Sequence, residues 1–295
     1  MGSDVGGAKT VVEVLKGATG YLESRGIDQP RLAAELLLGR LLGCKRLDLY
    51  VRHETVLSER LLEAMRRGIR RVAAHEPVQY VLGHVEFMGH MFQVDKRALI
   101  PRPETEALTE TVLGFEPLWA ERTEPGPVIV DVGTGSGCII LSIALEKPQA
   151  VCIGFDVSTE ALALARENAK LHELHERVAL VGGQELADVL EPETADAVVA
   201  NLPYVRTAEY EALPPHIRDH EPRAALDGGQ NGLAVISACI EESAILLKSG
   251  GACFLEIGRD QAADVSGLMS GAGFVNVVVK QDSAGLDRGG WGTLH

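Results

Sequence analysis

The chain has 295 residues, of which 46% are hydrophobic and 24% are charged, and this composition is that of a globular protein with a sizeable core. The formal net charge of −14 argues against a protein whose main partner is a nucleic-acid backbone, because phosphate binding requires Lys and Arg. No apolar run approaches the ~18 residues that span a membrane, and no signal peptide is visible, so we expect no membrane partner.

The first part of the chain is predicted to be helical. Segments 11–24, 30–43 and 58–75 all have the apolar spacing of amphipathic helices. Ser58 is suited to cap the third of these helices, and Pro30 fits the first position of the second, where its missing N–H costs little. We therefore expect residues 1–76 to form a small helical domain.

The composition changes at Pro77. Strand-like residues on both sides of Met88-Gly89-His90 predict a β-hairpin connector, which we place over residues 77–100. Pro101 prevents a helix up to that point, and Pro103 then fits the first position of a new helix whose first turn is acidic.

From residue 126 onward, short apolar runs alternate with helical segments. Runs without polar alternation indicate parallel strands buried on both faces by helices, so residues 101–295 are predicted to form an α/β domain. The predicted strands cover residues 127–133, 150–157, 177–183, 197–200, 251–258 and 274–282.

A glycine-rich loop follows the first of these strands. The stretch VIVDVGTGSG places Asp131 near the end of the strand and glycines at 133, 135 and 137 before a helix. Its G-x-G-x-G spacing differs from the dinucleotide motif G-x-G-x-x-G, and no Gly-Lys-Ser/Thr follows as in a P-loop. The Asp131 carboxylate would repel a pyrophosphate, but it could bind an ammonium group directly or through water. A purely structural turn is the alternative.

The next two strands also end in residues that suit a ligand. Asp156 ends the second strand, where an acidic side chain can accept hydrogen bonds from both hydroxyls of a ribose. The third strand ends in Gly182-Gly183-Gln184, near the expected place of an adenine. A ligand with an amino acid end, a ribose and an adenine is S-adenosylmethionine.

The fourth strand ends in Asn201-Leu202-Pro203-Tyr204. Asn and Pro commonly end strands, so a simple turn is one interpretation. The other is a site on the same rim of the sheet as the glycine loop and Asp156.

Taken together, these motifs resemble the class I S-adenosylmethionine-dependent methyltransferases, and Asn-Leu-Pro-Tyr is similar to the Asn-Pro-Pro-Tyr motif of those that methylate base amines or glutamine amides. The stretches VLGHVEFMGHMFQVD, LIPRPETE, EPRAALDGGQNGL and DRGG further resemble the bacterial release factor glutamine methyltransferases, the HemK or PrmC family. The resemblance implies a Rossmann-like, mostly parallel seven-stranded sheet, with an N-terminal helical bundle joined by the hairpin. It also implies that residues 1–76 recognise the substrate and that residues 101–295 bind S-adenosylmethionine and catalyse the reaction.

The implied activity is N5-methylation of the glutamine in the Gly-Gly-Gln motif of class I peptide chain release factors. S-adenosylmethionine would be the cofactor and S-adenosylhomocysteine the product. We expect a cytoplasmic monomer that needs no metal and does not bind nucleic acid directly. The alternatives are glutamine methylation of a ribosomal protein, N6-adenine methylation of nucleic acid, and a non-catalytic cofactor-binding module. The net charge, the sequence PRPETE and the intact Asn-Leu-Pro-Tyr motif favour the release factor.

The motif suggests how a planar amide would be held. The Asn201 side-chain oxygen and the Leu202 carbonyl can accept its two N–H bonds, Pro203 biases Leu202 toward an extended conformation, and Tyr204 offers a flat face. The family usually has proline in place of Leu202.

Many relatives have an acidic residue and an aromatic in place of Gly183 and Gln184, which leaves the binding of adenine open. Arg102, Thr105 and Glu106 would support the cofactor site by resemblance, although an ordinary first-turn acid is the alternative for Glu106. Glu256, at the end of a predicted strand, receives no role. The predicted cofactor-binding residues are Asp131, Val132, Gly133, Thr134, Gly135, Gly137, Asp156, Gly183, Gln184 and Asn201; the predicted catalytic or substrate-binding residues are Asn201, Leu202, Pro203 and Tyr204.

Overall fold

The computed structural model describes residues 9–120, 126–281 and 285–295. The chain divides into two compact units. The first comprises the described residues up to Gly83 together with Pro215–His220, and the second comprises His84–Pro214 and Glu221–His295.

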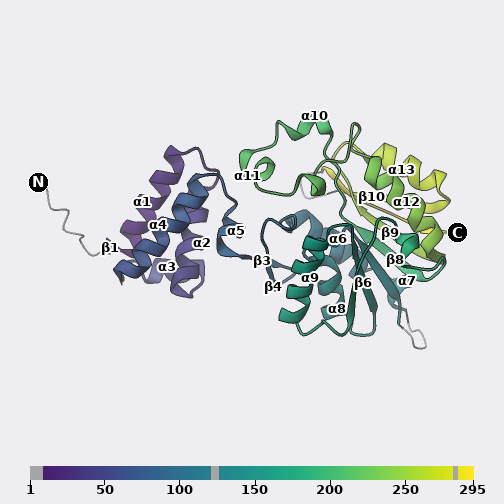
Figure 1. Cartoon of the computed structure of the whole chain (residues 1–295), viewed down its shortest axis with the longest axis horizontal. Helices are drawn as coiled ribbons and strands as arrows, with labels where there is room; N and C mark the ends of the chain where they lie inside the picture. Colours follow the sequence, from purple (N-terminus) through teal and green to yellow (C-terminus); the bar gives the residue numbers. More distant parts are fainter. Residues whose placement is uncertain (1–8, 121–125, 282–284) are drawn as a thin grey trace, which may run out of the picture. The chain divides into compact units, whose positions relative to one another are not determined.

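The first unit is the predicted helical bundle (Figure 1). The Ser58 hydroxyl accepts the N–H of Leu61 and caps α4, and Pro30 occupies the first turn of α2, so both predictions are confirmed. Apolar faces of α1, α2 and α4 form one core. The elements of this unit are β1 (Lys9–Thr10), α1 (Val11–Ser24), α2 (Pro30–Leu42), α3 (Arg46–Val51), β2 (Val56–Leu57), α4 (Glu59–Ala73), α5 (Val78–Leu82) and α11 (Pro215–Arg218).

The segment after Pro77 differs in part from the prediction. The hairpin around Met88-Gly89-His90 is confirmed, with β3 (His84–Phe87) paired to β4 (His90–Gln93). The preceding residues, however, form the short helix α5, because Val78 and its neighbours pack against the core of the helical unit. Gly83, with φ of 78°, ends that helix.

The second unit is built on one seven-stranded sheet with the order β10-β11-β9-β8-β5-β6-β7. Strands β5 to β9 run parallel to one another, and β11 runs antiparallel to both β9 and β10. The predicted mostly parallel seven-stranded sheet is therefore confirmed; the last residue of the predicted strand 274–282 lies outside the described residues. The strands are β5 (Val128–Val132), β6 (Val151–Asp156), β7 (Val178–Gly182), β8 (Ala195–Ala200), β9 (Leu247–Glu256), β10 (Phe274–Gln281) and β11 (Asp287–Leu294).

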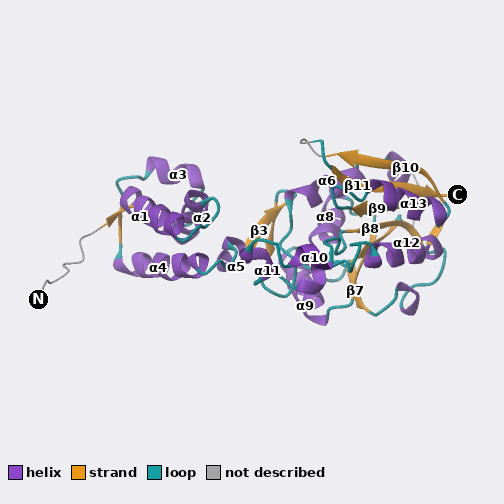
Figure 2. Ribbon diagram, turned by 90° about the horizontal axis from the view of Figure 1, so that it is seen from above, coloured by secondary structure: helices purple, strands orange, loops and turns teal. Residues whose placement is uncertain are grey.

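Helices cover both faces of this sheet (Figure 2). Successive strand residues point to opposite faces, so Ile129 packs in a core with α6 and α8, whereas Val130 packs in a second core with α12 and α13. The helical elements are α6 (Pro103–Leu113), α7 (Glu116–Trp119), α8 (Cys138–Glu146), α9 (Thr159–Leu171), η1 (Leu186–Asp188), α10 (Thr207–Tyr210), η2 (Arg223–Ala225), α12 (Ala234–Leu246) and α13 (Ala262–Gly271).

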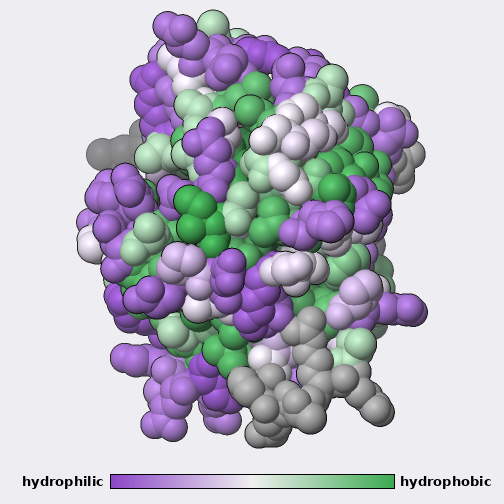
Figure 3. Space-filling model, turned by 90° about the vertical axis from the view of Figure 1, so that its right-hand side faces the viewer, coloured by the Kyte–Doolittle hydropathy of each residue, from purple (hydrophilic) through white to green (hydrophobic). Residues whose placement is uncertain are grey.

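The surface of the second unit is mixed. On the face that carries α12 and α13, apolar side chains lie among polar ones (Figure 3). Within the described ranges, no helix combines the length and the apolar character that crossing a bilayer requires.

The parallel arrangement positions the candidate site. Val132 at the end of β5 pairs with Phe155 of β6 on one side and with Ala200 of β8 on the other. The residues that follow these three strands therefore meet at one edge of the sheet, which is where open α/β sheets bind ligands.

Candidate active site

A cavity of about 430 Å³ lies at this edge. Its volume is within the range of roughly 300–1,000 Å³ that is usual for small-molecule sites. Ten of the predicted residues line it: Thr105, Val132, Gly133, Thr134, Gly135, Asp156, Gln184, Asn201, Leu202 and Pro203. The other six predicted residues do not line it: Arg102, Glu106, Asp131, Gly137, Gly183 and Tyr204.

The glycine loop depends on its glycines. Gly133, Gly135 and Gly137 have φ of 73°, 56° and 81°, a left-handed region in which a side chain is strained. A Cβ on Gly133 would also stand 3.0 Å from the Leu202 side chain. The loop therefore packs directly against the end of β8.

Asp156 is held so that it can receive hydroxyl groups. Its Oδ2 accepts the N–H of Gly135 at 2.8 Å, and its Oδ1 accepts the N–H of Ser158 at 2.8 Å. Burial raises the pKa of this carboxyl, and the hydrogen bonds from the two backbone N–H groups partly oppose that rise. Each oxygen keeps further acceptor capacity, and because Asp156 lines the cavity, the pair suits two adjacent hydroxyls.

Asp131 lies fully buried behind the loop. Its Oδ2 accepts the hydroxyl of Thr134 at 2.6 Å, while its Oδ1 accepts no hydrogen bond from the described residues. Burial, with a smaller contribution from the charge of Asp156, raises the pKa of Asp131 to about 7. A buried acceptor without a partner is what a water molecule or an ammonium group would satisfy.

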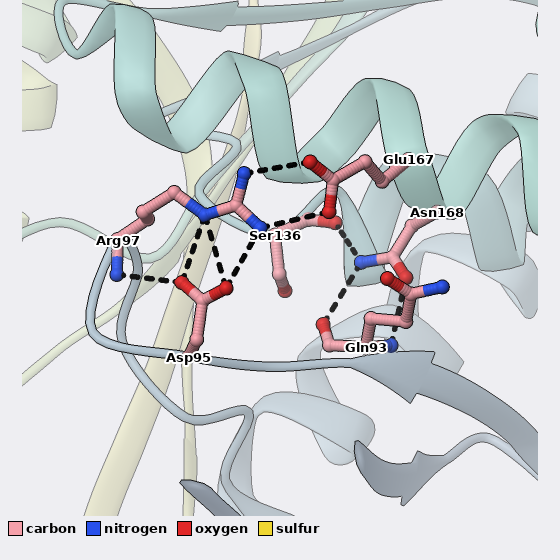
Figure 4. A network of polar contacts seen from close by, with 6 residues as sticks. All are labelled: Gln93, Asp95, Arg97, Ser136, Glu167 and Asn168. Carbon is pink, nitrogen blue, oxygen red and sulfur yellow. Dashed lines mark hydrogen bonds and ion pairs between the residues drawn. The ribbon is translucent and has the colours of Figure 1, made fainter. Parts of the chain in front are cut away.

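The segment from Gln93 to Arg97 is tied to α9 by a polar network that the sequence did not indicate (Figure 4). The buried side chain of Asn168 accepts the N–H of Gln93 at 2.7 Å and donates to the carbonyl of Gln93 at 3.1 Å and of Ser136 at 2.8 Å. One amide thus joins the end of the hairpin, the glycine loop and α9.

Arg97 forms the second part of this network. Its guanidinium binds Asp95 and Glu167 at 2.7 Å each, as Figure 4 shows, and it lowers the pKa of Asp95. Arg97 also lines the cavity, so these contacts fix one wall of it.

Glu221 is a further residue that the sequence did not indicate. Its buried carboxylate accepts the N–H of Ile100 at 3.1 Å and forms an ion pair with Arg102. Arg102 therefore organises the site through Glu221. Glu106 accepts the N–H of Met88 at 2.6 Å, and so it stabilises the turn of the hairpin.

The end of β8 is linked to two neighbouring elements. Asn201 donates from Nδ2 to the Thr105 hydroxyl at 2.9 Å, and Thr105 donates to Glu256 at 2.7 Å. The Tyr204 hydroxyl lies 3.4 Å from Glu256, and burial raises the pKa of Tyr204. Gln261 donates to the backbone carbonyl of Tyr204 at 3.2 Å.

The region near Gln184 contains another residue that the sequence did not indicate. Glu242 lines the cavity from α12, and its Oε2 accepts the N–H of Leu186 at 2.7 Å. The apolar pattern of α12 indicated only a core helix. Gly183 lies against the Phe155 ring, which a Cβ at this position would approach to 3.0 Å.

Comparison with known proteins extends over nearly the whole chain. Residues 13–83 match the PrmC N-terminal domain family, and residues 123–271 match a methyltransferase domain family. The release factor glutamine methyltransferase of Chlorobaculum tepidum is 42% identical over 95% of this chain and 96% of its own. That of Geobacter sulfurreducens is 39% identical over 95% of each chain.

Solved structures support the fold. A methyltransferase from Pyrococcus furiosus aligns with a TM-score of 0.51 and 18% identity, over 70% of this chain and 89% of its own. The catalytic domain of hMettl16, solved in complex with MAT2A 3′UTR hairpin 6, aligns with a TM-score of 0.54 and 14% identity, over 69% and 75%. With the full-length similarity, the conclusion is that the chain belongs to the release factor glutamine methyltransferase family.

Proposed function

We propose that this protein methylates the side-chain amide nitrogen, N5, of the glutamine in the Gly-Gly-Gln motif of class I peptide chain release factors. The observation that carries the proposal is the position of Asn201, Leu202 and Pro203 on the wall of the cavity that Asp156 and the glycine loop also line. The full-length relatives, which are named release factor glutamine methyltransferases, support the choice of substrate.

S-adenosylmethionine is the proposed cofactor, and it supplies a methyl group that is already activated on a sulfonium. The residues present fit it. Asp156 can accept both hydroxyls of the ribose, and the unpartnered oxygen of Asp131 can receive the methionine ammonium through water. Gln184 and Glu242 line the same cavity, and we propose that they hold the adenine.

Asn201 and Leu202 would hold the substrate amide. The Asn201 Oδ1 accepts one N–H and the Leu202 carbonyl, which accepts no hydrogen bond from the described residues, accepts the other. By accepting both N–H bonds, the two oxygens would turn the amide nitrogen toward the methyl group, so alignment would carry much of the rate. The nitrogen would gain the methyl group as the sulfonium–methyl bond breaks and S-adenosylhomocysteine is left, and one amide proton would then pass to water. The substitution of leucine for the usual proline leaves this carbonyl in place.

We further propose that residues 1–76 contact the release factor, that residues 77–100 connect the two parts, and that residues 101–295 carry the reaction. The match of residues 13–83 to the PrmC N-terminal domain supports the first assignment. The enzyme would act in the cytoplasm as a monomer without a metal, and the net charge of −14 favours a protein partner over nucleic acid.

The test compares substrates side by side. Purified protein is incubated with S-adenosylmethionine labelled in the methyl group and with a class I release factor, the same factor with Gln→Ala in its Gly-Gly-Gln motif, or a large-subunit ribosomal protein. We expect label only on the unaltered release factor. Label on the altered factor, or a faster reaction with the ribosomal protein, would refute the substrate assignment.

A further inference from the structure

We propose that Glu256 and Thr105 are positioning residues that fix the side-chain amide of Asn201 in the one orientation able to receive the substrate glutamine. This inference rests on the proposed glutamine methylation, and it adds two residues that take part through Asn201.

The three side chains come from three elements and form a continuous chain. Glu256 ends β9 and is 3% exposed, and Thr105 lies in the first turn of α6 and is 2% exposed. The Thr105 Oγ1 donates to the Glu256 Oε2 at 2.7 Å, and the Asn201 Nδ2 donates to the Thr105 Oγ1 at 2.9 Å.

The order of donors along this chain is dictated by chemistry. An ionised carboxylate can only accept, so the single proton of the Thr105 hydroxyl is directed to Glu256. The Thr105 oxygen can then only accept, and the side-chain group of Asn201 that faces it must be the amine. A reversed amide would place Oδ1 against the lone pairs of Thr105. The Oδ1 of Asn201 is therefore kept on its other side, away from Thr105.

This orientation matters because the two ends of an Asn amide have nearly the same shape. Without a partner that distinguishes them, both orientations would be occupied. In the reversed one, Asn201 would present an N–H to the N–H of the substrate, which removes an acceptor and adds a repulsive contact. Thr105 selects one orientation of the Asn201 amide, because its oxygen can only accept a hydrogen bond. Glu256 keeps Thr105 in that state by accepting the hydrogen bond of its hydroxyl proton.

The surroundings of Glu256 make this control dependent on pH. Its carboxylate faces Glu104 of α6, Tyr204, Arg288 of β11 and the thiol of Cys138. Burial is the main cause that raises the pKa of Glu256 to about 7. A protonated Glu256 can donate to the Thr105 oxygen, which frees the Thr105 proton to bind Oδ1 of a reversed Asn201. Turnover should therefore fall as the pH drops through this range.

The first test separates hydrogen bonding from packing at Thr105. Thr105→Val keeps the shape and removes the hydroxyl, whereas Thr105→Ser keeps the hydroxyl and removes a methyl group. We expect Thr105→Val to lower turnover by about 10- to 100-fold, as loss of a supporting hydrogen bond does at other sites, and Thr105→Ser to restore most of it. Cofactor affinity, measured by calorimetry, should change little in both. Turnover that is higher in the Val variant than in the Ser variant would show a packing role and overturn the inference.

A matched control is available on the same helix. The buried Thr109 donates its hydroxyl to the Thr105 carbonyl within α6 and lies outside the cavity wall. Thr109→Val should leave turnover close to the wild-type value. A loss as large as that of Thr105→Val would mean that disturbing α6 is the cause, and would contradict the inference.

The second test concerns Glu256. In Glu256→Gln the side chain can both donate and accept, so the order of donors is no longer fixed. We expect turnover at pH 8 to fall by about tenfold or more, and the fall in activity below pH 7 that we expect of the wild type to be absent. An unchanged acid limb in this variant would overturn the role of Glu256.

A third measurement needs no substrate and so separates this inference from the proposed function. In the NMR spectrum, one Nδ2 proton of Asn201 should be shifted and protected from exchange by its bond to Thr105. Thr105→Val should abolish that protection and Thr105→Ser should keep it. Equal protection in all three proteins would refute the inference, whereas a wild type that fails to methylate a release factor would refute only the proposed function.

Discussion

Gly228 lies so close to Pro203 that a Cβ on Gly228 would stand 2.4 Å from the Pro203 carbonyl oxygen and 2.8 Å from that of Gly232. Real Cβ atoms essentially never approach another atom to less than 3.0 Å. The Gly228 N–H also donates to the Val205 carbonyl at 2.9 Å. The loop that begins at Gly228 thus supports the backbone of the Asn-Leu-Pro-Tyr segment from behind, and glycine is required for this contact.

The first prediction follows from that contact. Gly228→Ala should displace the backbone at Pro203 and with it the Leu202 carbonyl, which costs about 1–3 kcal/mol as overpacking does elsewhere. We expect turnover to fall at least about tenfold while cofactor binding, measured by calorimetry, changes little. Gly267→Ala on α13, where nothing lies within 4 Å, is the control. Equal turnover in the two variants would refute the supporting role of Gly228.

The second prediction concerns the proposed ribose site. In Asp156→Asn one oxygen becomes an NH₂ group, which would face the N–H of either Gly135 or Ser158. Hydrogen bonds to charged groups contribute about 1.5–3 kcal/mol, so we expect S-adenosylmethionine to bind about 10- to 100-fold more weakly. Titration calorimetry measures this. The exposed Glu160→Gln on α9 should bind as the wild type does. Full affinity in Asp156→Asn would contradict the assignment.

The third prediction is a dependence of stability on pH. The pKa of Glu256 is about 7 in the folded protein against 4.5 for the free group, so the folded state binds the extra proton between these values. The contribution of Glu256 to the free energy of unfolding is therefore greatest below pH 4.5 and is lost as the pH rises to about 7. The Gln side chain does not titrate. The free energy of unfolding of Glu256→Gln, relative to that of the wild type, should therefore rise by about 3 kcal/mol between pH 4.5 and 8.

Urea unfolding of the two proteins at several pH values checks this. The difference between them isolates Glu256, because other titrating groups, including Asp131 with its own raised pKa, are common to both. The exposed Glu110→Gln on α6 should show no such trend. A constant difference between wild type and Glu256→Gln across this range would show that the carboxyl titrates normally.

The fourth prediction concerns the network of Figure 4. Asn168→Asp removes the donors to the Gln93 and Ser136 carbonyls and buries an acceptor against them. An unsatisfied buried group costs about 1–3 kcal/mol, and more when it is charged, so we expect a loss of at least that size in the free energy of unfolding. The exposed Asn276→Asp on β10 should change it by less than about 0.5 kcal/mol. Similar losses in the free energy of unfolding of the two variants would show that the hydrogen bonds of Asn168 do not stabilise the fold more than those of an exposed asparagine.

The parts of the site that the sequence predicted are those set by local rules. The carboxyl ends of parallel strands share one edge, so the glycine loop, Asp156 and Asn201 could be placed together from strand order alone, and they line one cavity. Caps such as Ser58 follow equally local rules. Rules that involve only neighbouring residues were therefore enough to predict the strand ends and the helix cap.

The missed residues depend on contacts between distant segments. Glu221 binds the N–H of Ile100, which is 121 residues away, and Asn168 binds Gln93 across 75 residues. No spacing in the sequence indicates such a pair. The helix α5 was missed for a similar reason, because packing of Val78 on the helical core outweighs its local preference for strand.

The proposed reaction depends most directly on Asn201, whose side-chain oxygen accepts an N–H of the substrate amide. The direct measurement is single-turnover methyl transfer to a release factor by the wild type and by Asn201→Ala, with cofactor affinity measured in parallel and the methyl group located by mass spectrometry. We expect the variant to bind S-adenosylmethionine normally and transfer to fall at least about 100-fold, and we expect the wild type to place the methyl on the Gly-Gly-Gln glutamine. Near-normal transfer by Asn201→Ala, or a methyl group on another residue, would contradict this role of Asn201.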